Sequence, residues 1–213
     1  MDLRVGKDQT LVQILPEKAI LIPEFGLLVI SDVHLGKDVH FRNSGIPVPP
    51  QVGDRIFTDL NILLSKYTFH TVLFLGDLFH SVKNSSFDTF ASWIDTWSNS
   101  VSFKLVLGNH DIYHVDDYRV IGLESMPHFK AGSILFEHQP GEVHNDFYHI
   151  SGHIHPAVRL RGKGKQSLKL PCFWFSRQFA VLPAFGHFTG TFIIEPAKSD
   201  RIYVVADGLV SAF

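Results

Sequence analysis

The chain has 213 residues, of which 45% are hydrophobic and 19% are charged, a composition that predicts one folded domain over residues 1–213 and excludes a disordered protein. Its net charge of −2 excludes a protein that coats nucleic acid through a broad basic surface, although not an enzyme that meets phosphate only at its active site. The apolar runs are too short to span a bilayer, and charged residues precede the first of them, so neither a membrane segment nor a signal peptide is expected.

Cysteine and histidine usage set two further limits. The single cysteine, Cys172, cannot form an internal disulfide and stands in an apolar run, which predicts a buried thiol and a reducing, cytoplasmic compartment. Histidine is abundant, with 13 residues, and many of them follow apolar runs at points where strands are expected to end.

The first half of the chain alternates between short apolar runs and helical patterns. Strands are expected at residues 19–22, 27–30, 71–75 and 103–107, where β-branched and aromatic residues dominate. A helix is expected over residues 52–67, behind Pro49 and Pro50, and a second over residues 86–97, with Ser86 as its candidate N-cap. This order of strands and helices predicts a parallel sheet with functional groups at the carboxyl ends of its strands.

After residue 118 the pattern consists mainly of strands. They are expected at residues 133–136, 147–150, 157–160, 168–175, 179–182, 191–194 and 201–205, and they predict a second, largely antiparallel sheet packed on the first. One local charge bias falls in this half and contains Arg159, Arg161, Lys163, Lys165 and Lys169. It is typical of a basic hairpin, which is either a solvated edge or a surface that contacts the sugar–phosphate backbone of a nucleic acid.

Five expected strand ends carry residues that bind metals. They are Asp32-x-His34, Gly76-Asp77, Gly108-Asn109-His110-Asp111, His138 and Gly152-His153-x-His155. A single histidine after a strand is more often an ordinary hydrogen-bonded residue, but bare carboxylates at buried strand ends cost several kcal/mol unless cations neutralise them. Residues two apart in an extended segment point to the same side, so His153 and His155 are expected to reach different ions, while Asp32 and His34 converge on one. The set predicts a dinuclear centre, with its ions about 3.5–4 Å apart.

The types of ligand limit the metal. The chain has no cysteine cluster, which excludes a structural zinc site and an iron–sulfur cluster. A mixture of imidazole, carboxylate and amide oxygen suits Mn²⁺, Fe²⁺, Zn²⁺ or Co²⁺ better than Mg²⁺ or Ca²⁺, which prefer oxygen ligands alone.

The five motifs, in this order, resemble those of the calcineurin-like metallophosphoesterases. The resemblance implies an α/β (α+β) fold, in which two packed mixed β-sheets are flanked by helices in a four-layer sandwich. It also implies two divalent ions, Mn²⁺ foremost, with Fe, Zn, Co or Ni as alternatives. One ion would take Asp32, His34 and His155, the other Asn109, His138 and His153, and Asp77 would bridge them. The chain departs from the family at His138-Gln139-Pro140, where His-Gly is common, so a stiffer loop is expected there.

A narrower resemblance extends to about residue 190. Residues 31–37, 41–49, 152–157 and 182–186 look like the bacterial ligase-associated DNA damage response group, often called PdeM. Members are encoded beside a DNA ligase, a helicase and a nuclease, which implies a DNA substrate and a repair system as partner. The oligomeric state stays open, with a dimer among the alternatives.

The motif residues divide into ligands and candidate catalytic groups. Two divalent ions carry more charge than Asp32 and Asp77 return, so the site is expected to attract phosphate, and a water between the ions would supply hydroxide near neutral pH. His110 is not needed as a ligand and is expected to protonate the leaving oxygen, with Asp111 orienting its ring. The alternative is that His110 only packs.

Three residues near the motifs are candidates for substrate contacts. Arg42 and Lys37 stand in a segment rich in Gly and Pro, where either could hold a phosphate or remain a solvated cation. His80 is expected to be either a partner of the metal ligands or a substrate contact.

The leading hypothesis is a dinuclear metal-dependent phosphodiesterase or endonuclease that acts on DNA through metal-activated hydroxide. The alternative enzyme is a phosphodiesterase for cyclic nucleotides or dinucleotides, or a phosphomonoesterase. A non-catalytic binding platform is a third alternative. It would lack ligands or His110, and the sequence lacks neither.

Overall fold

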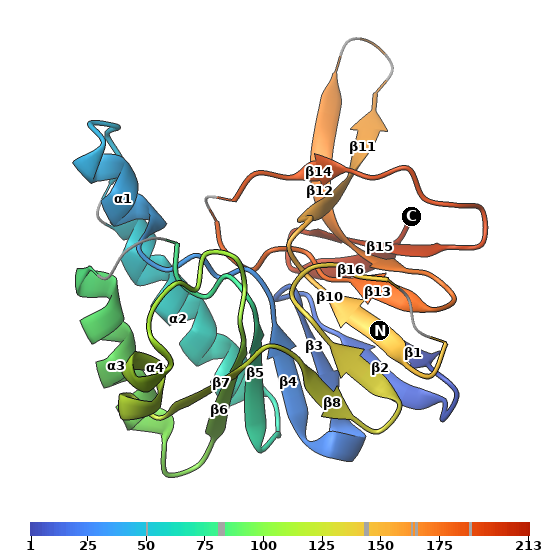
Figure 1. Ribbon diagram of the computed structural model, residues 1–213. Helices are drawn as coiled ribbons and strands as arrows, with labels where there is room; N and C mark the ends of the chain where they lie inside the picture. The colour runs from blue at the N-terminus through green and yellow to red at the C-terminus, as the bar shows by residue number, and fades with distance from the viewer. Residues whose placement is uncertain (50, 81–83, 143–144, 163, 165, 188) are drawn as a thin grey trace.

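Two β-sheets packed face to face form the centre of the molecule, and helices cover the outer face of the first sheet (Figure 1). The computed structural model describes residues 1–213 except 50, 81–83, 143–144, 163, 165 and 188, and the side chains of residues 43, 51, 52 and 54 are also outside the description. Pro50, expected at a helix start, and Lys163 and Lys165 of the basic segment therefore lie outside the described residues.

The first sheet has seven strands in sequential order. They are β1 (Asp2–Val5), β2 (Thr10–Ile14), β3 (Ala19–Ile22), β4 (Leu27–Ile30), β5 (Thr71–Leu75), β6 (Ser102–Val106) and β7 (Leu123–Met126). The first four form an antiparallel meander, and β4 to β7 run parallel to one another. The expected parallel sheet is therefore present, with an antiparallel extension at its N-terminal edge.

The second sheet is mixed. It contains β8 (Phe129–Ala131), β9 (Ile134–Phe136), β10 (Tyr148–Ser151), β11 (Pro156–Arg161), β12 (Ser167–Phe175), β13 (Phe179–Val181), β14 (Phe192–Ile193), β15 (Arg201–Ala206) and β16 (Leu209–Ala212). Its main path runs β14-β11-β12-β13-β10-β9-β8, with β15 paired to β12. Its centre is parallel, because β10 runs parallel to both β9 and β13. The sheet is nevertheless largely antiparallel, as expected, because five of the eight strand pairs in its described residues are antiparallel.

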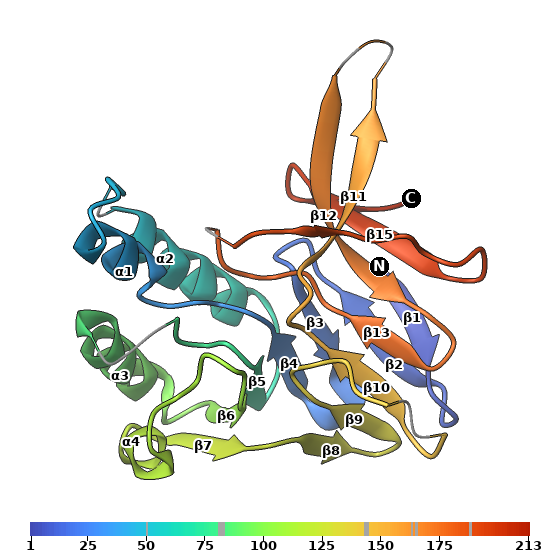
Figure 2. The same ribbon diagram turned by 45° about the horizontal axis from the view of Figure 1, so that its top comes forward.

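The helices lie on one side of the first sheet, as Figures 1 and 2 show together. They are α1 (Lys37–Asn43), α2 (Gln51–Lys66), α3 (Ser85–Trp97) and α4 (Val115–Val120), with a short 3₁₀ turn at Pro23–Phe25. The described residues thus form three layers and lack the fourth, helical layer that was expected over the second sheet. Neighbouring antiparallel strands such as β11, β12 and β13 need no crossover helix. Within the described part of the chain, no helix combines the length and apolar character needed to cross a membrane.

Strand β4 shows how the three layers share one core. All four of its residues are buried. Leu28 and Ile30 pack toward the helices, whereas Leu27 and Val29 pack toward the second sheet. A central strand with both faces covered has no polar positions, which explains its continuous apolar run.

The register of the strands brings their carboxyl ends to one edge. Ile30 pairs with Phe74 in β5, and Phe74 pairs with Leu105 in β6, so the segments that follow these strands lie next to one another. In the second sheet, Phe136 of β9 pairs with Ile150 of β10 in the same way. All five motif segments therefore leave the two sheets at neighbouring points.

The N-cap of α3 differs from the expected residue. Asn84, not Ser86, is the N-cap, because its side chain accepts a hydrogen bond from the backbone N–H of Ser86 at 2.9 Å. Ser86 is already inside the first turn.

We predict that Asn84→Ala lowers the free energy of unfolding by about 0.5–2 kcal/mol, because the first turn of α3 loses its side-chain acceptor. Ser86→Ala is the matched control and should change stability by less than about 0.5 kcal/mol. Urea unfolding measures both. An equal loss in the two variants would contradict the assignment of the cap.

Candidate metal centre

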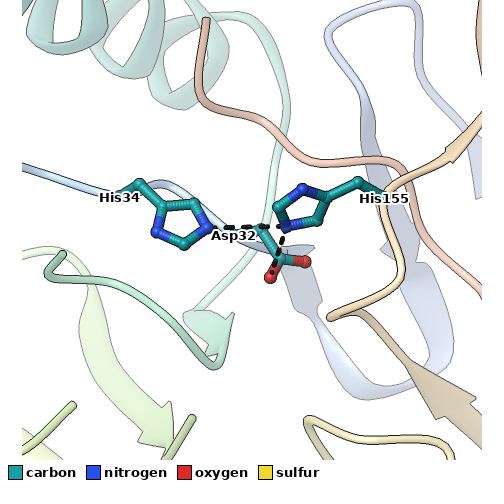
Figure 3. A group of neighbouring side chains, drawn as sticks. All are labelled: Asp32, His34 and His155. Atoms are coloured by element: carbon teal, nitrogen blue, oxygen red, sulfur yellow. Dashed lines mark hydrogen bonds and ion pairs between the residues drawn. The ribbon is translucent and has the colours of Figure 1, made fainter. Parts of the chain in front are cut away.

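The predicted ligands gather in two groups where the strand ends of both sheets meet. Asp32, His34 and His155 form one group, Asp77, His138 and His153 form the other, and within each group the donor atoms lie within 4.8 Å of one another. Figure 3 shows the first group, in which the rings of His34 and His155 flank the Asp32 carboxylate. His155 Nε2 lies 3.1 Å from Asp32 Oδ1 and 3.5 Å from His34 Nε2.

Asp77 stands between the two groups. Its Oδ1 lies 3.4 Å from His138 Nε2, and its Oδ2 lies 3.8 Å from His34 Nε2. His138 Nε2 also lies 3.2 Å from the amide oxygen of Asn109 and 3.1 Å from His153 Nδ1. One carboxylate thus faces donor atoms of both groups, as a bridging ligand must.

Several of these residues have a left-handed backbone. The φ angles are +54° at Asp32, +53° at His34, +48° at Asp77, +67° at His153 and +54° at His155. This conformation costs most residues about 1–2 kcal/mol, and Asp and His are enriched among the non-glycine residues that adopt it. The expectation that these side chains project from extended segments is therefore wrong. The sharp turn at each residue, not the strand pleat, aims its side chain at the site.

The glycines that precede three ligands leave space for side chains of neighbouring loops. A Cβ at Gly76 would overlap the His138 ring, one at Gly108 would overlap Asp77, and one at Gly152 would overlap Ser31 and Asp32. Each contact joins two loops that are distant in the sequence. The ligands can therefore approach one another only because these three positions lack a side chain.

Backbone carbonyls orient two of the ligand rings. His138 Nδ1 donates to the carbonyl of Leu75 at 3.2 Å, and His155 Nδ1 donates to the carbonyl of Gly190 at 2.9 Å. A carbonyl oxygen only accepts, so in each neutral ring the proton is on Nδ1 and Nε2 presents a lone pair to the site.

The donor atoms fit divalent cations. His138 Nε2 faces His153 Nδ1 at 3.1 Å, a separation at which two ring nitrogens need a proton or a cation between them. Asp32 and Asp77 are both buried, and their charges require compensation by positive charge. Imidazole, carboxylate and the amide oxygen of Asn109 form a donor set suited to Mn²⁺, Fe²⁺, Zn²⁺ or Co²⁺.

The protonation states of the ligands also suit a metal. Burial lowers the pKa of His34 to about 3 and also lowers the pKa of His153. Burial alone would raise the pKa of Asp77, but the hydrogen bond and charge of His138 and the backbone N–H of His110 outweigh it and hold this pKa at about 2. At neutral pH the two imidazoles are neutral and Asp77 is ionised, which are the forms that bind metals.

His110 lies beside the ligands, and the backbone fixes its ring. Its Nδ1 donates to the carbonyl of His80 at 3.1 Å, and the two rings stack with centroids 5.0 Å apart. Its backbone N–H donates to Asp77 Oδ1 at 2.9 Å. Among the described residues Nε2 has no partner, so this atom is available to exchange a proton with a substrate.

Asp111 stabilises the backbone around the 108–111 loop and does not orient the His110 ring. Its carboxylate is buried and accepts the backbone N–H groups of Phe79 at 3.1 Å and Gly108 at 2.9 Å. Burial raises the pKa of Asp111 to about 6, although these two hydrogen bonds lower it in part. The expected contact with His110 is corrected, because both carboxylate oxygens face backbone donors.

His80 and His40 extend the histidine cluster beyond the ligands. His80 Nδ1 lies 3.4 Å from His34 Nδ1, and the His40 ring packs edge-on against His80 with centroids 5.4 Å apart. Burial, together with the positive charge of Lys37, lowers the pKa of His80 to about 4. The sequence gives no signal for His40, because it lies in α1, where no helix was expected.

Arg42 is engaged within α1. Its guanidinium pairs with Asp38, one helical turn earlier, at 2.9 Å and lies 3.5 Å from the carbonyl of Val48. In the described part of the chain, no contact joins Arg42 to a ligand. Lys37 interacts electrostatically with Asp77, so it is the cation of α1 that acts on the centre. A phosphate contact by Arg42 stays a prediction.

Comparison with known proteins identifies the family. The model of the calcineurin-like phosphoesterase family matches residues 25–198, which include both ligand groups. The chain belongs to the calcineurin-like phosphoesterases. It is therefore a metal-dependent phosphoesterase, a hydrolase of a family that uses divalent metals.

Two solved structures are similar to this chain. The crystal structure of the Pseudomonas putida nuclease MPE matches with a TM-score of 0.79 and 25% sequence identity, over 100% of each chain. A conserved uncharacterized protein of Streptococcus pneumoniae TIGR4, described as a predicted phosphoesterase, has a TM-score of 0.35 and 17% identity, over 88% of this chain and 95% of the other. No curated protein matches the sequence.

We predict that Gly152→Ala weakens Mn²⁺ binding and activity by about 10- to 100-fold, because the new Cβ displaces Ser31 and Asp32. Gly141→Ala is the matched control, since the atoms nearest to its Cβ would be those of the Glu137 carboxylate, at 3.5 Å or more. Isothermal titration with Mn²⁺ and hydrolysis of bis-p-nitrophenyl phosphate measure the two effects. Unchanged metal affinity in Gly152→Ala would contradict the close packing of the loops.

We predict that Asp111→Asn lowers the free energy of unfolding by about 1–3 kcal/mol, because the amide NH₂ of the new side chain faces a backbone donor. The pKa of Asp111 in the folded protein, about 6, lies above its value in the unfolded chain, so the stabilisation that Asp111 gives to the wild type decreases as the pH rises from about 4 to 6. The difference in the free energy of unfolding between variant and wild type should therefore narrow over this interval. Thermal unfolding across the pH range tests this, and a constant or widening difference would contradict the raised pKa.

Proposed function

We propose that this chain is a two-metal nuclease that hydrolyses phosphodiester bonds in DNA, with Mn²⁺ as the foremost metal. The observation that carries the proposal is the position of Asp77 between two groups of imidazole and carboxylate donors. The similarity to the Pseudomonas putida nuclease over the whole chain supports a nuclease rather than another phosphoesterase. The proposal extends to a cytoplasmic role in DNA repair beside a ligase and a helicase, which the resemblance to the ligase-associated group implies.

The candidate ligands would hold two ions, and each ion would have its own set of ligands. Two divalent ions bound there would supply Lewis acidity and a nucleophile at neutral pH. Asp32, His34 and His155 would hold one ion, Asn109, His138 and His153 the other, and Asp77 both. The carbonyls of Leu75 and Gly190 fix the rings of His138 and His155, so these ligands keep their direction before metal or substrate arrives.

His110 is the proposed general acid. With Nδ1 bound to the carbonyl of His80, the protonated ring can give its Nε2 proton to the leaving oxygen. The backbone N–H of His110 binds Asp77, which ties the position of the acid to that of the bridging carboxylate. The proposed acid therefore directly follows the candidate ligand Asn109 and is hydrogen-bonded to Asp77 of a different loop.

We predict that Asp77→Asn loses both metals and nearly all activity, because neither ion keeps the shared carboxylate. His110→Ala should keep two metals per chain and lose about 10²- to 10⁴-fold in kcat. Metal content after loading with Mn²⁺, together with hydrolysis of bis-p-nitrophenyl phosphate, separates the two effects. His70→Ala is the matched control and should keep the wild-type metal content and activity, because His70 is exposed and directly precedes β5, at the opposite end of that strand from Asp77.

The outcomes of this experiment are distinct. A fully active His110→Ala variant would overturn the role of His110, and two metals bound to Asp77→Asn would overturn its bridging role. Failure of the wild type to hydrolyse the diester with Mn²⁺, Fe²⁺, Zn²⁺, Co²⁺ or Ni²⁺ would overturn the phosphodiesterase.

The substrate is tested with the same wild-type protein. Single-stranded DNA, duplex DNA, RNA, cyclic mononucleotides and dinucleotides are compared under one metal condition. The proposal predicts the highest kcat/KM for DNA. Turnover of the small nucleotides with little cleavage of DNA would assign the site to a small-nucleotide phosphodiesterase instead.

A further inference from the structure

The positive charge of the chain is concentrated in one segment. Residues 147–194 contain Arg159, Arg161, Lys163, Lys165, Lys169 and Arg177, and no Asp or Glu. The other 165 residues contain 13 Lys and Arg against 21 Asp and Glu, and so carry a net charge of −8. A segment of charge +6 on an otherwise acidic protein favours the binding of an anionic partner at that segment.

Three of these cations lie on a pair of strands that stands away from the body. Strands β11 and β12 pair antiparallel, and their ends project beyond the rest of the second sheet in both Figure 1 and Figure 2. We call the two paired strands β11 and β12 the basic hairpin. Arg159, Arg161 and Lys169 are exposed in it, whereas Ala157 and Val158 at its base are buried.

The register places two cations directly opposite each other. Arg159 pairs with Lys169, and Arg161 follows two residues later on the same face, opposite Ser167. Like charges at directly opposed positions destabilise a strand pair. Among the described residues, no carboxylate lies within ion-pair distance of any of the three cations. An anion from outside the chain would remove this repulsion.

The base of the hairpin adjoins the metal centre. Strand β11 begins at Pro156, directly after the ligand His155. Pro171 of β12 and His155 line the same pocket, of about 140 Å³. At about 3.3 Å per residue, Arg159 is about 10 Å and Arg161 about 17 Å along the strand from Pro156. A polyanion that extends from the centre can reach these cations, whereas a mononucleotide at the centre is too short.

We propose that the basic hairpin binds the phosphate backbone of a nucleic-acid strand whose scissile phosphate lies at the metal centre. The distance along the hairpin corresponds to about five nucleotides at 3.4 Å per nucleotide. The inference rests on the proposed nuclease function and adds that the substrate is a strand of at least that length. The hairpin holds the strand through charge and does not read its sequence.

The opposite face of the hairpin provides a matched control. Leu160 pairs with Leu168 there, and their exposed fractions are 40% and 57%. A protein partner or a second copy of the chain would use this apolar face, whereas a nucleic-acid backbone would use the face with the cations.

The test compares three variants of the full chain with wild type. The charge variant is Arg159→Ala, Arg161→Ala, Lys169→Ala, and the apolar variant is Leu160→Ala, Leu168→Ala. The third variant, Arg4→Ala, Lys7→Ala, Arg119→Ala, removes the same number of cations outside the acid-free segment. Fluorescence anisotropy measures the Kd for a labelled single-stranded DNA of about 20 nucleotides in EDTA, at several salt concentrations.

The charge variant should bind about 10- to 100-fold more weakly near 0.1 M salt, and the slope of log K against log salt should fall by about 2, since each single-strand contact contributes about 0.7. Hydrolysis of bis-p-nitrophenyl phosphate with Mn²⁺ should keep its wild-type rate, because this substrate is too small to reach Arg159. The other two variants should keep the wild-type Kd and slope.

Three results would overturn the inference. They are an unchanged Kd and slope in the charge variant, an equal loss in the variant that removes cations elsewhere, and a loss confined to the apolar variant. The last result would assign the hairpin to a protein partner. A wild type that binds the strand but hydrolyses no diester would instead overturn the nuclease function, and the hairpin would stand as a binding surface.

Discussion

The ligand loops of this phosphoesterase are packed so closely that three of the positions where they touch can hold only glycine. Gly76, Gly108 and Gly152 each lie against side chains of another loop. Several ligands also hold a left-handed backbone, which costs free energy that the surrounding fold must supply. The site therefore forms only when both sheets are assembled, since its ligands come from strand ends in each. A bound cation would stabilise the same arrangement, so metal affinity and folding are coupled.

The electrostatics of the molecule divide into two zones. At the centre, burial keeps the rings of His34 and His153 neutral, while Asp77 stays ionised beside His138. Outside the centre, the basic hairpin carries exposed cations in a segment, residues 147–194, whose sequence contains no Asp or Glu, while the rest of the chain is acidic. The first zone suits the capture of metal and one phosphate, and the second suits the neighbouring phosphates of a polymer. The net charge of the whole chain, −2, does not reveal this separation of positive and negative charge.

The sequence predicted the parts of the fold whose residue pattern is compatible with only one type of element. Strands β3, β4 and β5 agree with their apolar runs because central strands are buried on both faces. Strands β1, β2, β7, β8 and β16 and helices α1 and α4 were not expected, because their apolar positions are few and alternate with polar ones. The three-layer arrangement depends on the connections of the second sheet, which no local pattern reveals.

The site was predictable as a set of residue types but not as a geometry. The spacing of the motifs predicted a set of candidate ligands, and the structure brings six of them together in two groups, because strand ends in adjacent register converge. The predicted role of Asp111 was wrong. Its position next to His110 in the sequence does not show that the Asp111 carboxylate points away from that ring, toward the backbone N–H groups of Phe79 and Gly108. The carbonyls that orient the rings carry no sequence signal.

The proposed centre depends on Asp77, whose carboxylate would join two metal positions. A crystal structure of the Mn²⁺-loaded protein, with anomalous scattering recorded for manganese, tests it most directly. The account predicts two anomalous peaks about 3.5–4 Å apart, with one oxygen of Asp77 at each or one oxygen shared between them. A single peak, or two peaks too far apart to share the Asp77 carboxylate, would contradict it.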